Sequence, residues 1–406
     1  MEKTSKYSLP PTYKSKLQIK TDTVINKMNI LFITSYYPEP KIGGIERVTY
    51  LLSKYLSQHD FKVFNLRFNN SEYDDTFPFI NSSQLKNLHD RDSLRQYLIN
   101  NRINVIINQS HFFYTPIIES ARKNLNVRLY TVFHNRPMFE ALKLNEAIKY
   151  SSSKLKYIIP FIYPIYKLYS VKKLKREHKL SYLLSDKTIL LSSRFIDIYK
   201  KDLNIDGKKL TYINNPISFD NVTIDYTKKE KIVLIVARLY EAQKKISIAL
   251  DIWKGIEPQN SGWKLIIVGD GEDKKYYEEY CRKNNIQNVK FTGRTNPLPY
   301  YLKASIFMMT SKNEGWPLTL LEAMQTGVVP IVMDSFAALH DIIQDESNGF
   351  IVKYNDKKEF ADRLTLLINN QNYRLTIAKE GQKGCTKYSI DNIGKEWINL
   401  LNGHNE

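Results

Sequence analysis

The chain has 406 residues, of which 42% are hydrophobic and 25% are charged; this composition excludes a disordered or fibrous protein, and the length predicts two domains. Its formal net charge is +18, and nearly all of the excess lies in the first half. Residues 1–200 carry 32 lysines and arginines against 16 acids, whereas residues 201–406 carry 28 against 26. A charge of this size indicates a polyanionic partner: nucleic acid, an anionic membrane or a phosphorylated substrate.

The first part of the chain predicts a tail followed by one α/β domain. Residues 1–27 are polar and lack the apolar segment of a signal peptide, so we expect a flexible tail. Short apolar runs, typical of buried parallel strands, then alternate with segments of helical periodicity. The predicted strands are residues 29–34, 61–66, 105–107, 127–133 and 188–191. This alternation predicts a doubly wound α/β domain over residues 28–213.

The pattern restarts after a polar stretch, residues 214–230, which we interpret as a linker. Strands are predicted at residues 231–237, 263–268, 289–291, 306–309 and 329–333, and helices at 246–253, 299–303 and 357–368. These elements predict a second α/β domain over residues 231–385. Residues 386–406 contain a last helix, which we expect to pack back on the first domain. Two such domains in tandem predict a ligand-binding cleft between the carboxyl ends of two sheets.

The segment Ser311–Gly327, SKNEGWPLTLLEAMQTG, carries the most chemical information. It follows an apolar strand, and its proline and last glycine suit the start and the end of a helix. Glu314 is therefore predicted in the loop at the carboxyl end of the strand, and Glu322 on the helix. The free backbone N–H groups of Leu318 and Thr319 could receive an anion there. Two glutamates at this spacing, taken alone, would more often be a surface acid and an ordinary amphipathic helix.

Residues 311–334 resemble the donor-site signature of the GT4 family, which are retaining glycosyltransferases with the GT-B fold that use nucleotide-sugars. Further segments match this family in chain order: Gly43–Glu46, Val132–Asn135, Val236–Leu239, Val268–Glu272, Val329–Ile331 and Asn348–Val352. The resemblance covers roughly residues 28–400. It implies two Rossmann-like α/β domains that face a central cleft, with the acceptor in the first and the nucleotide-sugar in the second.

The resemblance also implies roles for residues of the second domain. Glu314 would hold a hydroxyl of the donor sugar, and Glu322 would hold the ribose. Arg238 and Lys244 would neutralise the leaving diphosphate without a metal ion. The family spacing leaves Lys245 as an alternative to Lys244, and a surface salt bridge is the structural alternative for Arg238.

In the first domain, the resemblance puts His134 beside the transferred sugar, and the alternative is a satisfied buried histidine. Gly43 and Gly44 would let their backbone amides approach phosphate or sugar closely, although a tight turn would also explain the pair. Arg294, in the second domain, is a weaker candidate near the base. No metal site is expected, because the seven histidines have no metal-ligand spacing and the Asp90-Arg91-Asp92 triplet, which mimics a metal-binding D-x-D motif, suits an exposed helix start.

The basic excess of the first half is densest in residues 151–180, which carry eight basic residues and one acid. Residues 155–166 are aromatic and apolar, and the cationic run 172–176 follows them. The longest apolar run, residues 157–166, is about half of the ~20 residues that span a bilayer. This segment suits the headgroup region of an anionic membrane. A core-packed helix with a solvated basic end is the alternative.

These features predict a retaining, metal-independent glycosyltransferase of the hexosyltransferase type. It would transfer a sugar from a nucleotide-sugar, with UDP as the expected nucleotide, to a glycan or lipid-linked acceptor in capsule or lipopolysaccharide biosynthesis. No cofactor is expected beyond this donor substrate. Two cysteines fit a reducing compartment, so we expect a cytoplasmic protein peripheral to the inner face of the membrane.

Two other functions are compatible with parts of the sequence. A nucleotide-sugar epimerase of the same fold would use the same donor motifs. A basic nucleic-acid-binding protein would account for the charge, but no helix-turn-helix, zinc-finger or RNA-binding signature is present, and the motifs of the second domain would stay unexplained. We therefore expect no nucleic-acid partner.

Overall fold

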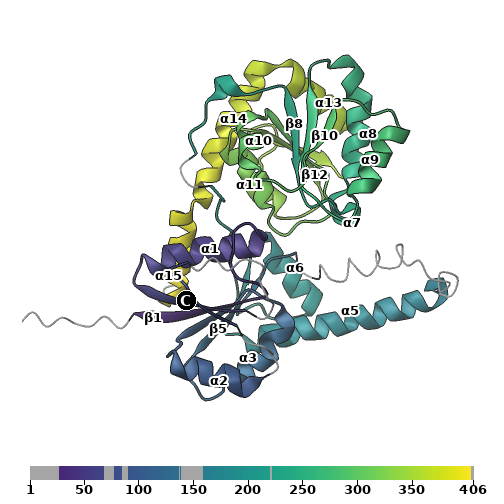
Figure 1. The fold of residues 1–406 in the computed structure, drawn as a ribbon. Coiled ribbons are helices and arrows are strands. Elements are labelled where there is room, and N and C mark those ends of the chain that lie inside the picture. Colours follow the sequence, from purple (N-terminus) through teal and green to yellow (C-terminus); the bar gives the residue numbers. More distant parts are fainter. Residues whose placement is uncertain are drawn as a thin grey trace, which may run out of the picture.

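The computed structural model describes residues 27–67, 77–84, 90–136, 138, 159–219 and 222–403, and only the backbone of 159–163. Except for Lys27, the predicted tail lies outside the described residues, as do residues 151–158 of the basic segment. Figure 1 shows two α/β units, one above the other, each built around a twisted sheet. The predicted fold class, two doubly wound Rossmann-like domains, is confirmed.

The first sheet has the strand order β3-β2-β1-β4-β5-β6-β7, and every pair is parallel. Its strands are β1 Met28–Thr34, β2 Phe61–Arg67, β3 Asn81–Gln84, β4 Val105–Asn108, β5 Arg128–Phe133, β6 Lys187–Leu190 and β7 Leu210–Tyr212. Its helices are α1 Gly44–Ser57, α2 Arg91–Asn100, η1 Phe112–Tyr114, α3 Thr115–Arg122, α5 Ile159–Leu184 and α6 Arg194–Leu203. The edge strands β3 and β7 are absent from the sequence-based prediction, because one is polar and the other has only three residues.

The second sheet has the order β10-β9-β8-β11-β12-β13, again all parallel. Its strands are β8 Ile232–Val236, β9 Lys264–Val268, β10 Val289–Phe291, β11 Ile306–Met309, β12 Val329–Asp334 and β13 Phe350–Lys353. The helices around it are η3 Tyr226–Lys228, α7 Glu241–Lys244, α8 Ile246–Ile256, η4 Glu257–Gln259, α9 Lys274–Lys283, α10 Leu298–Lys303, α11 Leu318–Gln325, α12 Leu339–Ile342, α13 Lys357–Asn369 and α14 Gln371–Cys385. The chain then returns through η5 Thr386–Tyr388 to α15 Ile390–Leu401.

The two sheets reverse their strand order at equivalent places. In the first sheet the reversal lies between β1 and β4, and in the second between β8 and β11. Connections on the two sides of such a point leave in opposite directions, so the carboxyl ends of these strands border a natural ligand site. The loops that follow β1, β4, β8 and β11 therefore decide where binding residues can stand.

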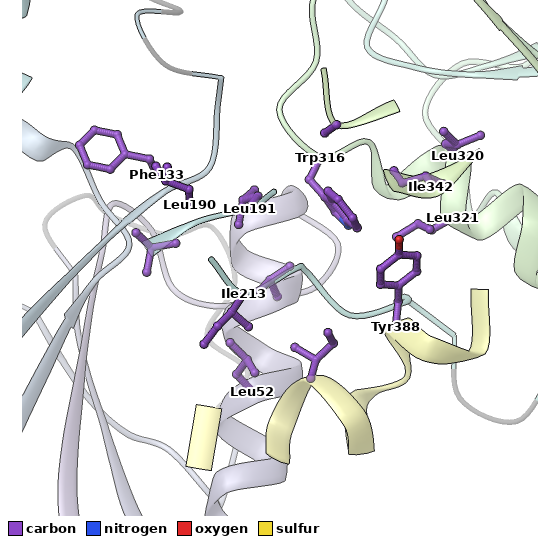
Figure 2. Packing of buried hydrophobic residues seen from close by; sticks show 14 of the residues in the cluster. Leu52, Phe133, Leu190, Leu191, Ile213, Trp316, Leu320, Leu321, Ile342 and Tyr388 are labelled. Atoms are coloured by element: carbon purple, nitrogen blue, oxygen red, sulfur yellow. The ribbon is translucent and has the colours of Figure 1, made fainter. Parts of the chain in front are cut away.

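A continuous apolar core joins the two domains. One cluster of buried side chains includes Leu52 of α1 and Leu190 of β6 in the first domain, and Leu320 and Leu321 of α11 in the second. Figure 2 shows this cluster, in which Trp316 points toward Tyr388 between the domains. Their rings meet edge to face, with centroids 5.1 Å apart. Burial of this shared apolar surface holds the carboxyl ends of the two sheets against each other.

The last helix, α15, lies against α1 of the first domain. Gly394 allows this approach, because a Cβ there would be 2.2 Å from the ring of Tyr55. Arg128 at the start of β5 donates a hydrogen bond of 2.7 Å from Nη2 to the carbonyl oxygen of Leu401. The chain thus crosses between the domains twice. Among the helices that the structure describes, none combines the length and the hydropathy needed to cross a membrane.

Candidate active site

The loops after β8 and β11 are tied together at the reversal point of the second sheet. Lys244, at the end of α7, places Nζ 2.6 Å from Oε1 of Glu314 in the loop after β11. Both side chains are largely buried, with exposed fractions of 18% for Lys244 and 9% for Glu314. The Thr310 hydroxyl lies 3.2 Å from the carbonyl oxygen of Lys244, and Lys312 donates its backbone N–H to Gln243 at 2.7 Å. These contacts hold an ammonium and a carboxylate together at the edge where ligands bind.

The two candidate lysines point to different partners. Lys244 faces Glu314, whereas Lys245 adopts a left-handed backbone conformation with φ of 51°. Its Nζ lies 3.9 Å from Oε1 of Glu241, one turn earlier on the same side of the loop. Of the two, Lys244 is therefore the residue that meets the glutamate of the motif.

The amino-terminus of α11 presents unpaired backbone donors. Among the described residues, none accepts a hydrogen bond from the backbone N–H of Leu318 or Thr319, while the N–H of Leu320 bonds to the carbonyl oxygen of Pro317 at 3.1 Å. Six of the eight residues of the helix are buried, and Leu318 and Thr319 at this end are partly exposed, so a ligand can reach their N–H groups. Such an end attracts anions.

Glu322, in the middle of α11, is 1% exposed and forms an ion pair with Arg47 of the first domain. Arg47 also reaches the carbonyl oxygen of Pro40 at 3.2 Å and the Ser218 hydroxyl at 3.4 Å. Burial and the negative charge of Glu322 raise the pKa of the neighbouring Tyr301. The sequence contains no sign of the pairing: Arg47 directly follows the glycine motif, but its partner is 275 residues away.

The glycines of the two domains mark places of close approach. Gly43 caps α1, and a Cβ on Gly44 would lie 3.4 Å from Cδ1 of Leu318, so the first turns of α1 and α11 face each other. Gly315 is in closer contact, because a Cβ there would be 2.2 Å from the carbonyl oxygen of His134. A larger residue beside Glu314 would push the domains apart.

His134 follows β5, and its Nε2 is buried without a hydrogen-bond partner among the described residues. Burial lowers the pKa of its imidazole to about 4, so the ring is neutral at pH 7. Two residues further on, Arg136 places Nη1 3.4 Å from Oδ1 of Asn313, next to Glu314. The loop after β5 therefore touches the loop after β11 across the domain boundary.

Two predicted arginines lie outside this cluster. Arg238 pairs with Glu272, and its side chain is 68% exposed, which is the arrangement of a surface salt bridge. Arg294 reaches across to the first domain, where Nη2 lies 2.6 Å from the carbonyl oxygen of Lys41 in the glycine loop. In the described parts of the chain, no group of three histidine, cysteine or acidic side chains is arranged to hold a metal ion.

Two family models match the chain one after the other. Glycosyltransferase Family 4 matches residues 42–221, and Glycosyl transferases group 1 matches residues 221–384. The amylovoran biosynthesis glycosyltransferase AmsD of Erwinia amylovora is 26% identical over 377 residues, which are 89% of this chain and 96% of that protein. The GalNAc-α-(1→4)-GalNAc-α-(1→3)-diNAcBac-PP-undecaprenol α-1,4-N-acetyl-D-galactosaminyltransferase of Campylobacter jejuni is 26% identical over 55% of this chain and 62% of its own length.

Solved structures share the fold across nearly the whole chain. The lipopolysaccharide outer core galactosyltransferase WaaB superposes with a TM-score of 0.67 at 19% identity, covering 93% of this chain and all of that one. HepE of Anabaena in complex with UDP superposes with a TM-score of 0.70 at 15% identity, with the same coverage. The chain has two facing Rossmann-like domains, and the two family models match them one after the other. It therefore belongs to the GT-B glycosyltransferases, with a Glycosyltransferase Family 4 domain followed by a Glycosyl transferases group 1 domain.

Proposed function

We propose that this glycosyltransferase transfers a sugar, with retention of configuration, from a UDP-sugar to a glycan or lipid-linked acceptor in cell-surface polysaccharide biosynthesis. The observation that carries the proposal is the pairing of Lys244 with Glu314 at the reversal point of the second sheet, beside the unpaired N–H groups of α11. UDP complexes among the similar structures support UDP as the nucleotide.

In this proposal, the diphosphate binds where the positive groups converge. The N–H groups of Leu318 and Thr319 face one phosphate, and Lys244 turns from Glu314 to the other. Arg238 is exposed, with an ion pair to Glu272 and a cation–π contact with Tyr240 at 5.8 Å, so its side chain can turn to the diphosphate at little cost. Together these groups stabilise the negative charge that develops on the leaving nucleotide, and no metal ion is required.

The carboxylates position the sugars. Glu314, released from Lys244, accepts hydrogen bonds from hydroxyls of the donor sugar, and Glu322, released from Arg47, accepts them from the ribose. His134 is neutral, so it can hydrogen-bond a sugar hydroxyl without adding charge. No side chain in the cluster is an evident nucleophile for double displacement, so we propose a same-face substitution in which the leaving phosphate takes the acceptor proton.

We propose that the acceptor is presented at an anionic membrane surface, through helix α5. The first half of α5 extends away from the first domain (Figure 1). Its Ile165 and Leu168 are each 72% exposed, and Tyr169 is 66% exposed. The cationic residues Lys172, Lys173, Lys175 and Arg176 follow and are also exposed. Apolar and cationic side chains in this order suit insertion at lipid headgroups on the cytoplasmic face.

The first experiment is a thermal-shift screen of UDP-, GDP- and ADP-sugars, because a ligand that binds the native state raises its unfolding temperature. Transfer by the unsubstituted protein is then compared with Glu314→Gln and Arg238→Ala, with the exposed Glu279→Gln as control. We expect about a 10²–10³-fold lower turnover for Glu314→Gln. Unchanged turnover in both site variants would refute the assignment, and nucleotide release independent of any acceptor would refute transfer.

A further inference from the structure

A small cavity lies at the reversal point of the first sheet, the counterpart of the donor position in the second. Its volume is about 120 Å³, and it is lined by Ser35 after β1, by Gln109 and Ser110 after β4, and by His134 after β5. It sits beside the donor loop, because the backbone of His134 contacts Gly315. A ligand in this cavity would therefore lie next to the donor sugar.

Two polar groups at this cavity have no partner. Gln109 is 1% exposed; one end of its amide lies 2.9 Å from the Thr49 hydroxyl, and the other, Nε2, is buried without a hydrogen bond among the described residues. The same holds for Nε2 of His134. A buried polar group left unpaired lowers the free energy of unfolding, so native proteins rarely keep such groups without a reason. A hydroxyl group bound in the cavity would give Nε2 of Gln109 the acceptor that it lacks.

The lining also indicates the class of ligand. Next to the amide and the imidazole stand the hydroxyls of Ser35 and Ser110, whose oxygens are 3.0 Å apart. Phe112 and Phe133, with ring centroids 5.6 Å apart, provide an apolar wall. No carboxylate or lysine is among the lining residues, and Arg136, the one guanidinium there, already reaches Asn313. The imidazoles of His111 and His178 also line the cavity. Many hydrogen-bonding groups beside aromatic rings, without a carboxylate among them, suit a hydroxyl-bearing ring.

We propose that this cavity binds hydroxyl groups of the acceptor's terminal sugar, and that Gln109 determines which sugar is accepted. The inference rests on the proposed function, since it needs an acceptor sugar beside the donor. The volume equals that of about four water molecules, which is room for the edge of one ring and not for an oligosaccharide. Thr49 of α1 positions the Gln109 amide, so that its free end is aimed without a loss of side-chain entropy on binding.

The test compares Gln109→Leu, which removes both ends of the amide at similar size, with Gln109→Glu, which keeps the shape and replaces the amide nitrogen. The control is Gln96→Leu, on the exposed surface of α2. Saturation-transfer NMR with the methyl glycosides of glucose, galactose, N-acetylglucosamine and N-acetylgalactosamine measures direct binding. We expect at least one glycoside to bind the unsubstituted protein, and its dissociation constant to rise about tenfold in both Gln109 variants but not in the control.

The transfer assay adds a kinetic readout. With the glycoside that binds best, the acceptor KM is expected to rise about tenfold in Gln109→Glu, while kcat changes much less. Circular dichroism and the unfolding temperature report whether the variants are folded. The proposal is overturned if no glycoside binds, or if folded Gln109 variants bind as tightly as the control. If glycosides bind but no nucleotide-sugar does, the proposed function fails and the sugar site stands.

Discussion

Helices α11 and α5 carry the two most informative segments of the chain, and they differ in how far their side chains are exposed to solvent. In α11, six of the eight residues are buried, and Glu322 is held by an arginine from the other domain. In the first half of α5, apolar side chains are exposed and the cations that follow them point to solvent. A buried carboxylate needs a partner, whereas exposed apolar and basic groups need a surface to meet.

The comparison also explains the uneven charge of the two halves. In the second domain, Lys244 is used locally, because it pairs with Glu314. In α5, the only ion pair within the cationic run joins Lys173 to Glu177 at 3.9 Å, among the described residues. A cation that is paired in the protein interior belongs to a binding site, whereas exposed cations without an ion pair are available to a large anionic partner.

The largest effect is expected for removal of the α5 charges. Changing all four cations of the run to glutamine should weaken binding to phosphatidylglycerol vesicles by about 10³-fold, at about 1 kcal/mol per residue. Vesicle flotation at low and high salt measures this. The control variant changes four exposed lysines of the same domain, Lys123, Lys200, Lys201 and Lys208. Equal losses in both variants would show that only net charge matters, and no loss in either would refute membrane binding.

The donor side is tested by the two adjacent lysines. Lys244→Ala should lower kcat about 10²–10³-fold, because it removes the ammonium from the diphosphate and leaves the buried carboxylate of Glu314 unpaired. Lys245→Ala should change kcat less than threefold, because its contact with Glu241 contributes about 0.6 kcal/mol at most. Nucleotide release with the donor found in the screen gives both values. A larger loss in Lys245→Ala would reverse the assignment.

The junction between the domains is expected to depend on Arg47. Arg47→Ala should lower the free energy of unfolding by about 3 kcal/mol, because Glu322 then loses its cation while 1% exposed. The matched control, Arg91→Ala, breaks an exposed pair with Asp92 at 3.0 Å and should cost below ~1 kcal/mol. Urea unfolding followed by tryptophan fluorescence compares them, and similar values would mean that the Arg47 pair is not buried in solution.

The smallest effect concerns the pH dependence of His134. Its pKa is about 4 in the folded protein and near 6.5 when unfolded, so the unfolded state binds more protons between these values. Stability that is complete above pH 6.5 is therefore lost progressively as the pH falls toward 4. His134→Gln should remove this pH-dependent contribution to stability. Between pH 7.5 and pH 5, the Tm of the variant should therefore fall by roughly 2–4 °C less than the Tm of the unsubstituted protein. Parallel Tm curves for both proteins would place the imidazole in solvent.

Local sequence patterns predicted most of the fold, because each buried strand is an apolar run that can be recognised from its own residues. Every predicted strand is present, and the end of each lies within one residue of its predicted position. The patterns miss β3 and β7, whose pairing depends on a neighbouring strand more than on their own composition. Asp90 is, as predicted, a helix start: its carboxylate accepts the backbone N–H of Ser93 at 3.0 Å.

By itself, the sequence determined that there are two doubly wound sheets, that Glu314 stands in a loop at a strand end, and that the basic excess belongs to the first domain. Each of these follows from neighbours along the chain. The tertiary structure decided that Lys244 and not Lys245 meets Glu314, 70 residues away, and that Arg47 holds Glu322 from the other domain. It also left Nε2 of Gln109 without a hydrogen-bond partner among the described residues. Such contacts depend on which strands pair within a sheet and on how the two domains pack together, and no local pattern encodes either.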